Sequence, residues 1–340
     1  MRRPVVAFLF LANLLSCACI YSQRAKAVTS VRDSDRDGLS DSLEAELLAA
    51  FAPDFMVSRT DCSIAPAQFA PAITKPTVMA DDGTIYGQAF PRKHHPGEVE
   101  LHYYHLWRED CGELGHALDT EHVSALVQLG KEPGSAVALY WYASAHEDTI
   151  CDASHLARAE TLGAKKHGPA VWISRGKHAS FLSEDLCTYG CGGDRCDQMV
   201  PLKIREIVNL GEADAPMNSI VWLRSPDWPL QEKMGRSDFL PVRLARVDNS
   251  PQTDVVWANP SKRPAQAAIL GLNAGMGGAA AGARATDTAL LISGDDTGAA
   301  LGVTSSKTGN ALSRSSRNVW KALKKSAHRT GKFLNPSQNQ

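Results

Sequence analysis

The sequence lacks the signatures of the common enzyme and nucleotide-binding classes. It contains no Gly-rich phosphate loop, no H-E-x-x-H motif, no G-x-S-x-G motif and no internal repeat. The formal net charge of -1 gives no global sign of nucleic-acid binding, and we expect no specific nucleic-acid partner. Long amphipathic helices are also scarce, which argues against an alternating α/β fold.

No apolar run reaches the roughly 20 residues that a comfortable membrane-spanning helix needs. The run over residues 5–20 follows two arginines and is typical of a secretory signal, so we expect a secreted, periplasmic or cell-envelope protein. Two processing routes remain open. The small-x-small sequence at residues 25–27 predicts a cleaved signal peptide over residues 1–27, whereas Cys17 ends a sequence similar to a bacterial lipoprotein box.

The cysteines predict disulfides. Removal of residues 1–27 leaves an even number of cysteines in an exported chain, a pattern typical of a disulfide framework whose pairing the spacing leaves open. The alternative is a zinc knot in CTYGCGGDRC, residues 187–196, with His178 nearby in the sequence. Oxidation outside the cytoplasm would remove the thiolates of such a knot. We therefore expect these residues to be oxidised: Cys62, Cys111, Cys151, Cys187, Cys191 and Cys196.

Short strand-like runs dominate the chain up to residue 248. Val, Ile, Tyr and Trp are frequent in these runs, and Gly or Pro separates them: VELHYYHLW, HVSALVQL, AVALYWYASAH, PAVWISRG, KIREIVNL and SIVWLR. They predict a mainly β protein with a β-sandwich over residues 54–248. Before it, residues 28–53 are expected to form a calcium-binding loop and a short helix that stops at Pro53.

The composition changes near residue 249. A Gly/Ala-rich run follows, and residues 301–340 contain eight Lys or Arg but no Asp or Glu. Such a composition buries too little apolar surface to offset chain entropy, so we expect residues 249–340 to form a disordered tail. Within it, NVWKALKKSAHRTGKFL has two interpretations: a basic amphipathic helix that contacts membrane or acidic polymers, or a solvated basic segment.

The sharpest local motif is DSDRDGLSDSLE, residues 33–44. Its carboxylates, its central glycine and its final glutamate all stand where a calcium loop requires them. No convincing helix precedes the loop, which resembles the single calcium loops of dockerin and thrombospondin type 3 repeats. We expect a structural Ca²⁺ site rather than a metal-free capping loop, with these ligands: Asp33, Asp35, Asp37, Leu39, Asp41 and Glu44.

A second group of polar residues opens a predicted strand in GHALDTEHVSALV. Asp119 and Glu121 are two residues apart and share one strand face, while His122 points to the other. His116 precedes them, so H-x-x-D-x-E offers one nitrogen and two carboxylates. We expect a second divalent cation here, Ca²⁺, Mg²⁺ or Mn²⁺, with these residues at or beside it: His116, Asp119, Glu121, His146 and His178.

The same stretch carries a family resemblance. DTEHV, followed by ASAH and GPAVWISRGKHASF, resembles an uncharacterised domain family related to vacuolar protein sorting protein 62. More distantly, HALDTE is similar to the H-x-x-D-x-E core of the necrosis- and ethylene-inducing proteins, a β-sandwich family that binds a divalent cation there. Leu118 and Thr120 depart from the toxin heptapeptide, so the resemblance does not imply toxin activity.

The resemblance covers residues 101–181 and has consequences for the site. It implies that His116, Asp119 and Glu121 are cation ligands. It also implies that one cleft collects His122, His146, Arg175 and His178.

Three functions remain open at this point. The first is a binding module whose cation bridges to a cell-surface glycan or a lipid headgroup. The second is a metal-dependent hydrolase, with His122 or His178 as general base and Arg175 as an oxyanion or phosphate clamp. The third is a structural envelope protein in which the histidines are incidental.

Overall fold

The computed structural model describes residues 32–262, apart from residues 72, 113–114, 133, 189, 191–192, 213–214, 217–229, 231–232 and 252–254. The expected signal segment, Cys17, Cys191, the SIVWLR strand and the basic tail all lie outside the described residues. Among the helices that are described, none has the length and apolar character needed to cross a bilayer.

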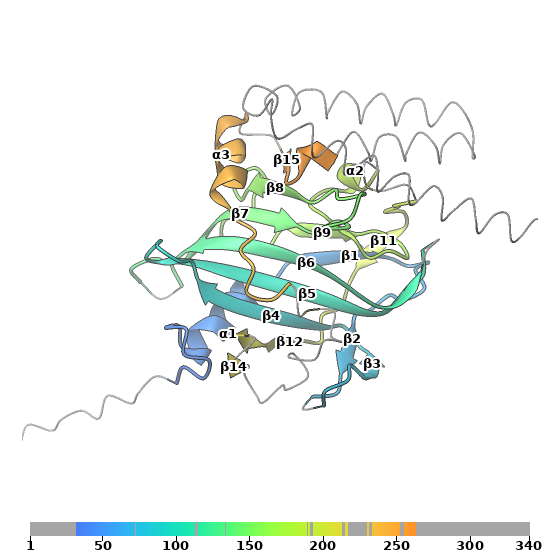
Figure 1. Ribbon diagram of the computed structural model, residues 1–340, viewed down its shortest axis with the longest axis horizontal. Coiled ribbons are helices and arrows are strands. Elements are labelled where there is room, and N and C mark those ends of the chain that lie inside the picture. The colour runs from blue at the N-terminus through green and yellow to red at the C-terminus, as the bar shows by residue number, and fades with distance from the viewer. Residues whose placement is uncertain are drawn as a thin grey trace, which may run out of the picture. The chain divides into compact units, whose positions relative to one another are not determined.

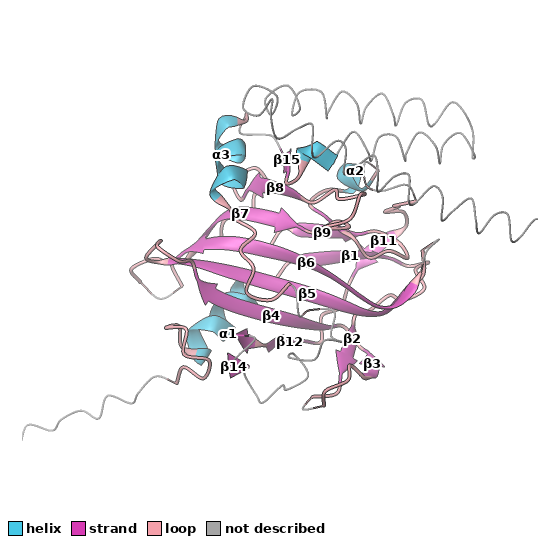
Figure 2. Ribbon diagram, in the orientation of Figure 1, coloured by secondary structure: helices cyan, strands magenta, loops and turns pink. Residues whose placement is uncertain are grey.

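The described chain is mainly β, as the sequence predicts, and two sheets dominate it (Figures 1 and 2). The smaller sheet has four strands in the order β10 (Ser180–Phe181), β9 (Ala170–Ile173), β1 (Asp54–Ser58) and β11 (Met199–Pro201). The larger has seven, in the order β12 (Glu206–Asn209), β4 (Thr84–Pro91), β5 (Glu98–Asp110), β6 (His116–Gln128), β7 (Val137–Ala143), β8 (His155–Arg158) and β15 (Val255–Trp257). Two small pairs complete the strands: β2 (Ala67–Phe69) with β3 (Val78–Asp81), and β13 (Gly211–Glu212) with β14 (Ala215–Pro216).

The two sheets share one apolar core, which makes the domain a β-sandwich. Alternate residues of the long strands β5 and β6 point into this core, because successive side chains of a strand face opposite ways. The core draws on both sheets, with Phe55, Val57, Val171 and Ile173 from the smaller and Leu101, Tyr103, Val123 and Ala125 from the larger. The intervening residues of β5 and β6 face the outside of the larger sheet.

Helix α1 (Asp41–Ala50) fixes the N-terminal loop to the edge of the larger sheet. The side chain of Ser40 caps the helix by accepting the backbone N–H of Leu43, and Leu48 is buried beneath it. Leu48 packs on Gly87 of β4, where an added Cβ would come within 2.8 Å of the leucine side chain. Glycine therefore lets the helix approach the strand closely.

The fold extends past the boundary expected between residues 248 and 249. Helix α3 (Pro241–Asn249) spans that boundary, and β15 pairs with β8 in the register Trp257 to His155. Trp257 is only 3% exposed. This strand is three residues long and its partner lies about a hundred residues earlier, so the local pattern after residue 249 gave no sign of it. Two short helices complete the elements, α2 (Glu184–Cys187) and η3 (Pro260–Lys262).

Disulfides join Cys62 to Cys111 and Cys187 to Cys196, and Cys151 is also disulfide-bonded. Every cysteine within the described residues is therefore oxidised. The zinc-knot alternative for residues 187–196 is wrong, because two of its three sulfur atoms are bonded to each other.

Candidate functional site

The loop before α1 gathers the carboxylates of Asp33, Asp35 and Asp37, with one oxygen of each within 4.8 Å of the others. Gly38, with a φ of 99°, makes the sharp turn between them and the helix. Backbone N–H groups orient two of the carboxylates, since Arg36 donates to Asp33 at 2.7 Å and Leu39 donates to Asp37 at 2.7 Å. The loop thus points acidic side chains inward.

Four carboxylate oxygens of this loop are buried and accept no hydrogen bond from any described residue: both of Asp35, one of Asp37 and Oε1 of Glu44. Asp35 is 6% exposed and Glu44 is 0% exposed. The other Glu44 oxygen accepts a hydrogen bond from Asn209 of β12 at 2.6 Å. Burial, reinforced by the neighbouring carboxylates, raises the pKa of Asp35 to about 6 and that of Glu44 to about 8.

The carboxylate of Asp41, another expected calcium ligand, has hydrogen-bond donors. Asp41 accepts hydrogen bonds from both the backbone N–H and the hydroxyl of Ser34, each at 2.7 Å. It stands at the loop position that often reaches calcium through a water molecule. Leu39 is 8% exposed and anchors the loop in the core.

The second candidate site lies on the inner face of β6. Asp119 and Glu121 stand opposite Trp107 and His105 of β5 and are 8% and 5% exposed. The Ser144 hydroxyl donates to Glu121 Oε2 at 2.6 Å, and Lys233 Nζ lies 3.9 Å from the same oxygen. Burial raises the pKa of Glu121 to about 7; Asp119 adds to the rise, while Lys233 opposes it.

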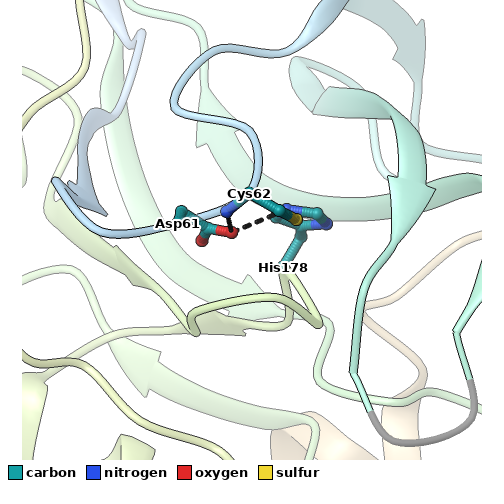
Figure 3. Close-up of side chains that lie close together, drawn as sticks. All are labelled: Asp61, Cys62 and His178. Atoms are coloured by element: carbon teal, nitrogen blue, oxygen red, sulfur yellow. Dashed lines mark hydrogen bonds and ion pairs between the residues drawn. The ribbon is translucent and has the colours of Figure 1, made fainter.

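His178 lies between two carboxylates, of which Figure 3 shows that of Asp61. Its Nδ1 is 3.1 Å from Asp119 Oδ2, and its Nε2 is 3.6 Å from Asp61 Oδ1. Burial alone would lower the pKa of His178, but Asp119 and Asp61 raise it to about 9. The imidazole is therefore protonated near neutral pH and has a carboxylate at each nitrogen.

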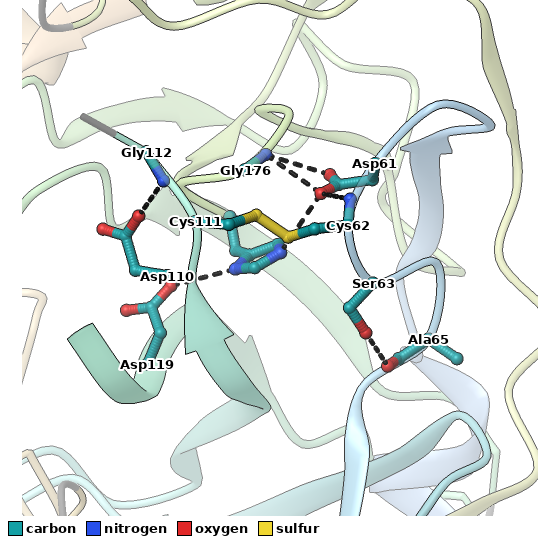
Figure 4. The surroundings of a disulfide bond; sticks show 10 residues. Asp61, Cys62, Ser63, Ala65, Asp110, Cys111, Gly112, Asp119 and Gly176 are labelled. Carbon is teal, nitrogen blue, oxygen red and sulfur yellow. Dashed lines mark hydrogen bonds and ion pairs between the residues drawn. A yellow bond between two sulfur atoms is a disulfide. The ribbon is translucent and has the colours of Figure 1, made fainter. Parts of the chain in front are cut away.

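The Cys62–Cys111 disulfide holds this arrangement in place (Figure 4). Cys62 follows Asp61 in the chain, and the backbone N–H of Cys111 donates to Gly176 at 2.8 Å, two residues before His178. The group Asp61, Cys62 and His178 has metal-ligand spacing. Cys62 offers no thiolate to a metal there, because its sulfur is in the disulfide.

His146 lies at the same end of the sandwich. Its backbone N–H donates to Glu121 at 3.4 Å, and its Nε2 is 2.9 Å from Asp194. Burial lowers the pKa of His146, but Asp194 and Glu121 raise it to about 9. Three non-glycine residues around this site have left-handed backbones: Leu118 with a φ of 61°, His146 with 52° and His178 with 54°. Such conformations are uncommon outside glycine and concentrate at functional sites.

His116 stands apart from this cluster. Its Nε2 is 3.9 Å from Asp110 Oδ2, its register partner on β5, and its side chain is 59% exposed. Among the described residues, no group of three ligand atoms within 4.8 Å includes His116, Asp119 or Glu121. A cation at these residues would therefore have to be bound through water or after side-chain rotation.

Of the hydrolase candidates, His122 lies apart from Asp119, Glu121 and His178. His122 lies on the outer face of β6, whereas Asp119 and Glu121 lie on the inner face. On the outer face, His122 Nε2 is 2.9 Å from Asp238. Arg175 donates to Thr60 at 3.2 Å and pairs with Asp197 at 3.3 Å.

Four polar residues that contact Glu121, His146 or His178 were missed from sequence: Asp61, Ser144, Asp194 and Lys233. Asp61 had one available signal, its position beside a cysteine expected in a disulfide. The others have no spacing that links them to the H-x-x-D-x-E motif.

No family model matches the chain, so the resemblances to the vacuolar protein sorting 62 family and to dockerin loops remain unsupported, and no curated protein matches it. Several solved structures do show likeness. The non-toxic HaNLP3 protein is 16% identical with a TM-score of 0.33, over 53% of this chain and 79% of its own. NLPPya in complex with glucosamine is 12% identical with a TM-score of 0.35, over 60% and 89%.

A third, the Necrosis and Ethylene inducing Protein 2 from the causal agent of cocoa's Witches Broom disease, is 17% identical with a TM-score of 0.30, over 53% and 80%. These proteins come from the family that HALDTE resembles. At these TM-scores the likeness carries no argument about function, which has to be argued from the residues of this chain.

Proposed function

We propose that the protein is an exported β-sandwich module that needs Ca²⁺ in its N-terminal loop and binds a surface ligand through a second divalent cation at Asp119 and Glu121. The ligand class is a cell-surface glycan or a lipid headgroup, whose hydroxyl or phosphate oxygens complete the coordination of such a cation. The observation that carries the proposal is the set of buried carboxylate oxygens without donors in residues 33–44.

Calcium resolves an energetic problem in this loop. A buried carboxylate without a hydrogen bond or a counter-charge is costly, and here Asp35, Asp37 and Glu44 share a small volume. The donors are hard oxygen atoms, which Ca²⁺ prefers, and the loop contains the turn that such a site requires. A bound cation would also stabilise the edge of the larger sheet, because Glu44 is hydrogen-bonded to Asn209 of β12.

The second cation has a weaker but specific basis. Asp119 and Glu121 are buried on one strand face, so their charges repel each other and must be neutralised. His178 neutralises Asp119, whereas Glu121 has Lys233 at 3.9 Å and shares the charge of His146 with Asp194. We infer that Glu121 is the principal protein ligand of the second cation, with Lys233 displaced when the ion binds.

Calcium titration of the secreted chain by calorimetry tests the first site. We expect wild type to bind one equivalent more Ca²⁺ than Asp35→Asn or Glu44→Gln. The matched control is Glu46→Gln, which makes the same charge change at an exposed position of α1 and should bind like wild type. Equal binding by all four proteins would refute the calcium loop.

The second site is tested with calcium-saturated protein. Mn²⁺ binding is followed by electron paramagnetic resonance in wild type and in Glu121→Gln, with Glu109→Gln as the control at an exposed position of β5. The same proteins are then applied to a glycan array and to anionic vesicles, with and without Mn²⁺. The proposal is supported if ligand binding requires the cation, is abolished in Glu121→Gln and is retained in Glu109→Gln. It is contradicted if ligand binding depends on neither the cation nor Glu121.

A further inference from the structure

The outer face of the larger sheet carries a buried polar cluster that the proposed function does not use. His102 of β5 and His122 of β6 meet Asp238, which precedes α3. These residues are 1%, 2% and 1% exposed. The cluster joins parts of the chain that are far apart, since His122 and Asp238 are separated by 116 positions.

The three side chains point ligand atoms at one another. Asp238 Oδ2 lies 2.9 Å from His122 Nε2 and 3.5 Å from His102 Nδ1, and all three ligand atoms lie within 4.8 Å. The two imidazole rings have centroids 5.8 Å apart. Atoms that share a zinc ion at about 2.0 to 2.2 Å stand roughly 3 to 4 Å from one another, so little movement would be needed.

A second carboxylate lies behind the first histidine. Glu100 is fully buried, and its Oε2 is 3.5 Å from Nε2 of His102, the ring nitrogen that faces away from Asp238. A histidine that binds a metal through one nitrogen usually presents the other to a carboxylate or a carbonyl. Ser124 similarly orients Asp238, donating its hydroxyl to Oδ2 at 2.6 Å.

The hydrogen bonds within the described residues leave this cluster incomplete. Both ring nitrogens of His102 and Nδ1 of His122 are buried. None of these three atoms has a hydrogen-bond partner among the described residues. The carboxylates of Asp238 and Glu100 lie beside the imidazoles of His102 and His122. An imidazole that binds a metal is neutral. A divalent cation would supply the missing partner of His102 Nδ1 and would add to the positive charge of Arg243, whose Nη1 lies 3.8 Å from Asp238 Oδ1.

We propose that His102, His122 and Asp238 bind a structural zinc ion, with Glu100 orienting His102. Two imidazole nitrogens with one carboxylate favour zinc over the oxygen-seeking Ca²⁺ and Mg²⁺. The complete burial of the three residues leaves no path for a substrate, so the ion has a structural role. It fastens the segment that leads into α3 onto strands β5 and β6.

The test uses the full secreted chain, purified without a histidine tag. After incubation with micromolar Zn²⁺ and desalting, elemental analysis should find one zinc per chain in wild type and none in His102→Gln or His122→Gln. Glu100→Gln should bind zinc about 10- to 100-fold more weakly. The matched control is His155→Gln, since His155 is equally buried but contacts Ala153 and Leu182 through its two ring nitrogens.

Two further measurements keep the test decisive if a variant fails to fold. Co²⁺ added to metal-free wild type should give the intense visible absorption of a site with nitrogen ligands in low coordination. A zinc-selective chelator should lower the melting temperature of wild type, and Zn²⁺ but not Ca²⁺ should restore it. Asp35→Asn, in the calcium loop, should still bind zinc, which separates this site from the first. Absence of stoichiometric zinc in wild type, or its retention in folded His122→Gln, overturns the proposal.

Discussion

The indole of Trp107 and the imidazole of His178 stack almost parallel, with ring centroids 4.0 Å apart and an interplanar angle of 7°. Trp107 is fully buried, so His178 is covered by an aromatic face while Asp119 and Asp61 stand at its two nitrogens. The two carboxylates attract the imidazolium cation and raise its pKa, and the aromatic face adds to that attraction. This explains how a fully buried histidine can have its pKa raised rather than lowered.

The pH dependence of stability follows from His178. The folded-state pKa is about 9 and the ordinary value 6.5, so the folded protein holds this proton more tightly than the unfolded chain. The stabilisation is complete below about pH 6.5 and is lost as the pH rises through about 9, with a size on the order of 3 kcal/mol. Urea unfolding of metal-free protein between pH 6 and 10 should show this loss in wild type, and His178→Gln should show a smaller loss, because the contribution of His146, whose pKa is also about 9, remains. Parallel pH profiles would contradict the assignment.

The raised pKa values of the carboxyl groups in residues 33–44 change stability in the same direction as His178, which is the reverse of the usual effect of a carboxylate. Burial raises the pKa of Glu44 to about 8 and that of Asp35 to about 6. The calcium-free fold therefore loses stability as the pH rises from the ordinary pKa of each carboxyl group to its raised pKa. Saturating Ca²⁺ should therefore raise the melting temperature more at pH 8.5 than at pH 5.5. At one hundred times the Kd, the gain is about 2.7 kcal/mol. Scanning calorimetry would disprove this if the calcium response were equal at both pH values or absent from wild type.

The two described disulfides should differ in their contribution to stability. Cys62 and Cys111 are 49 positions apart, whereas Cys187 and Cys196 are 9 apart. The longer loop removes more entropy from the unfolded chain, so its loss should cost about 4 kcal/mol against about 2.7 kcal/mol for the shorter one. Denaturant unfolding of the Cys→Ser double variants measures both. A larger loss from the shorter loop would show that native packing, not chain entropy, sets the order.

Truncation locates the end of the domain. A chain that stops after Lys262 should keep the wild-type melting temperature, because the elements described here are all retained. Stopping after Asn249 removes β15 and the buried Trp257, whose ring lies 5.8 Å from that of His155. We expect this shorter chain to lose at least about 3 kcal/mol, comparable to a large-to-small substitution of a buried tryptophan. Equal melting temperatures would show that β15 contributes nothing to the fold.

Local patterns were sufficient for the two faces of β6 and for the turn that gathers the carboxylates of residues 33–37, while calcium binding by that loop stays a prediction. The alternation in residues 119–122 placed Asp119 and Glu121 on one face and His122 on the other, because side-chain direction in a strand depends only on position. Likewise, the loop spacing from Asp33 to Glu44 depends on twelve consecutive residues. Here the sequence and the structure agree.

The partners of these residues could not be predicted in the same way. Asp238 reaches His122, and Lys233 reaches the carbonyl of Thr120, across more than a hundred positions. Such contacts depend on where the chain returns to the sheet, and no spacing in the sequence encodes that return. The expectation that His122 shares a cleft with Glu121 came from the family resemblance, while the strand alternation had already indicated the opposite face.

The left-handed backbones of Leu118, His146 and His178 imply a trade-off between stability and the ligand binding that we propose for this end of the sandwich. Each non-glycine residue in this region costs the fold on the order of 1 kcal/mol. Glycine at His146 or His178 would relax the main chain but remove an imidazole held by Asp194 or by Asp119 and Asp61. A selection for heat resistance alone should therefore accumulate substitutions at this end of the sandwich, and the variants that it enriches should be those in which ligand binding has been lost.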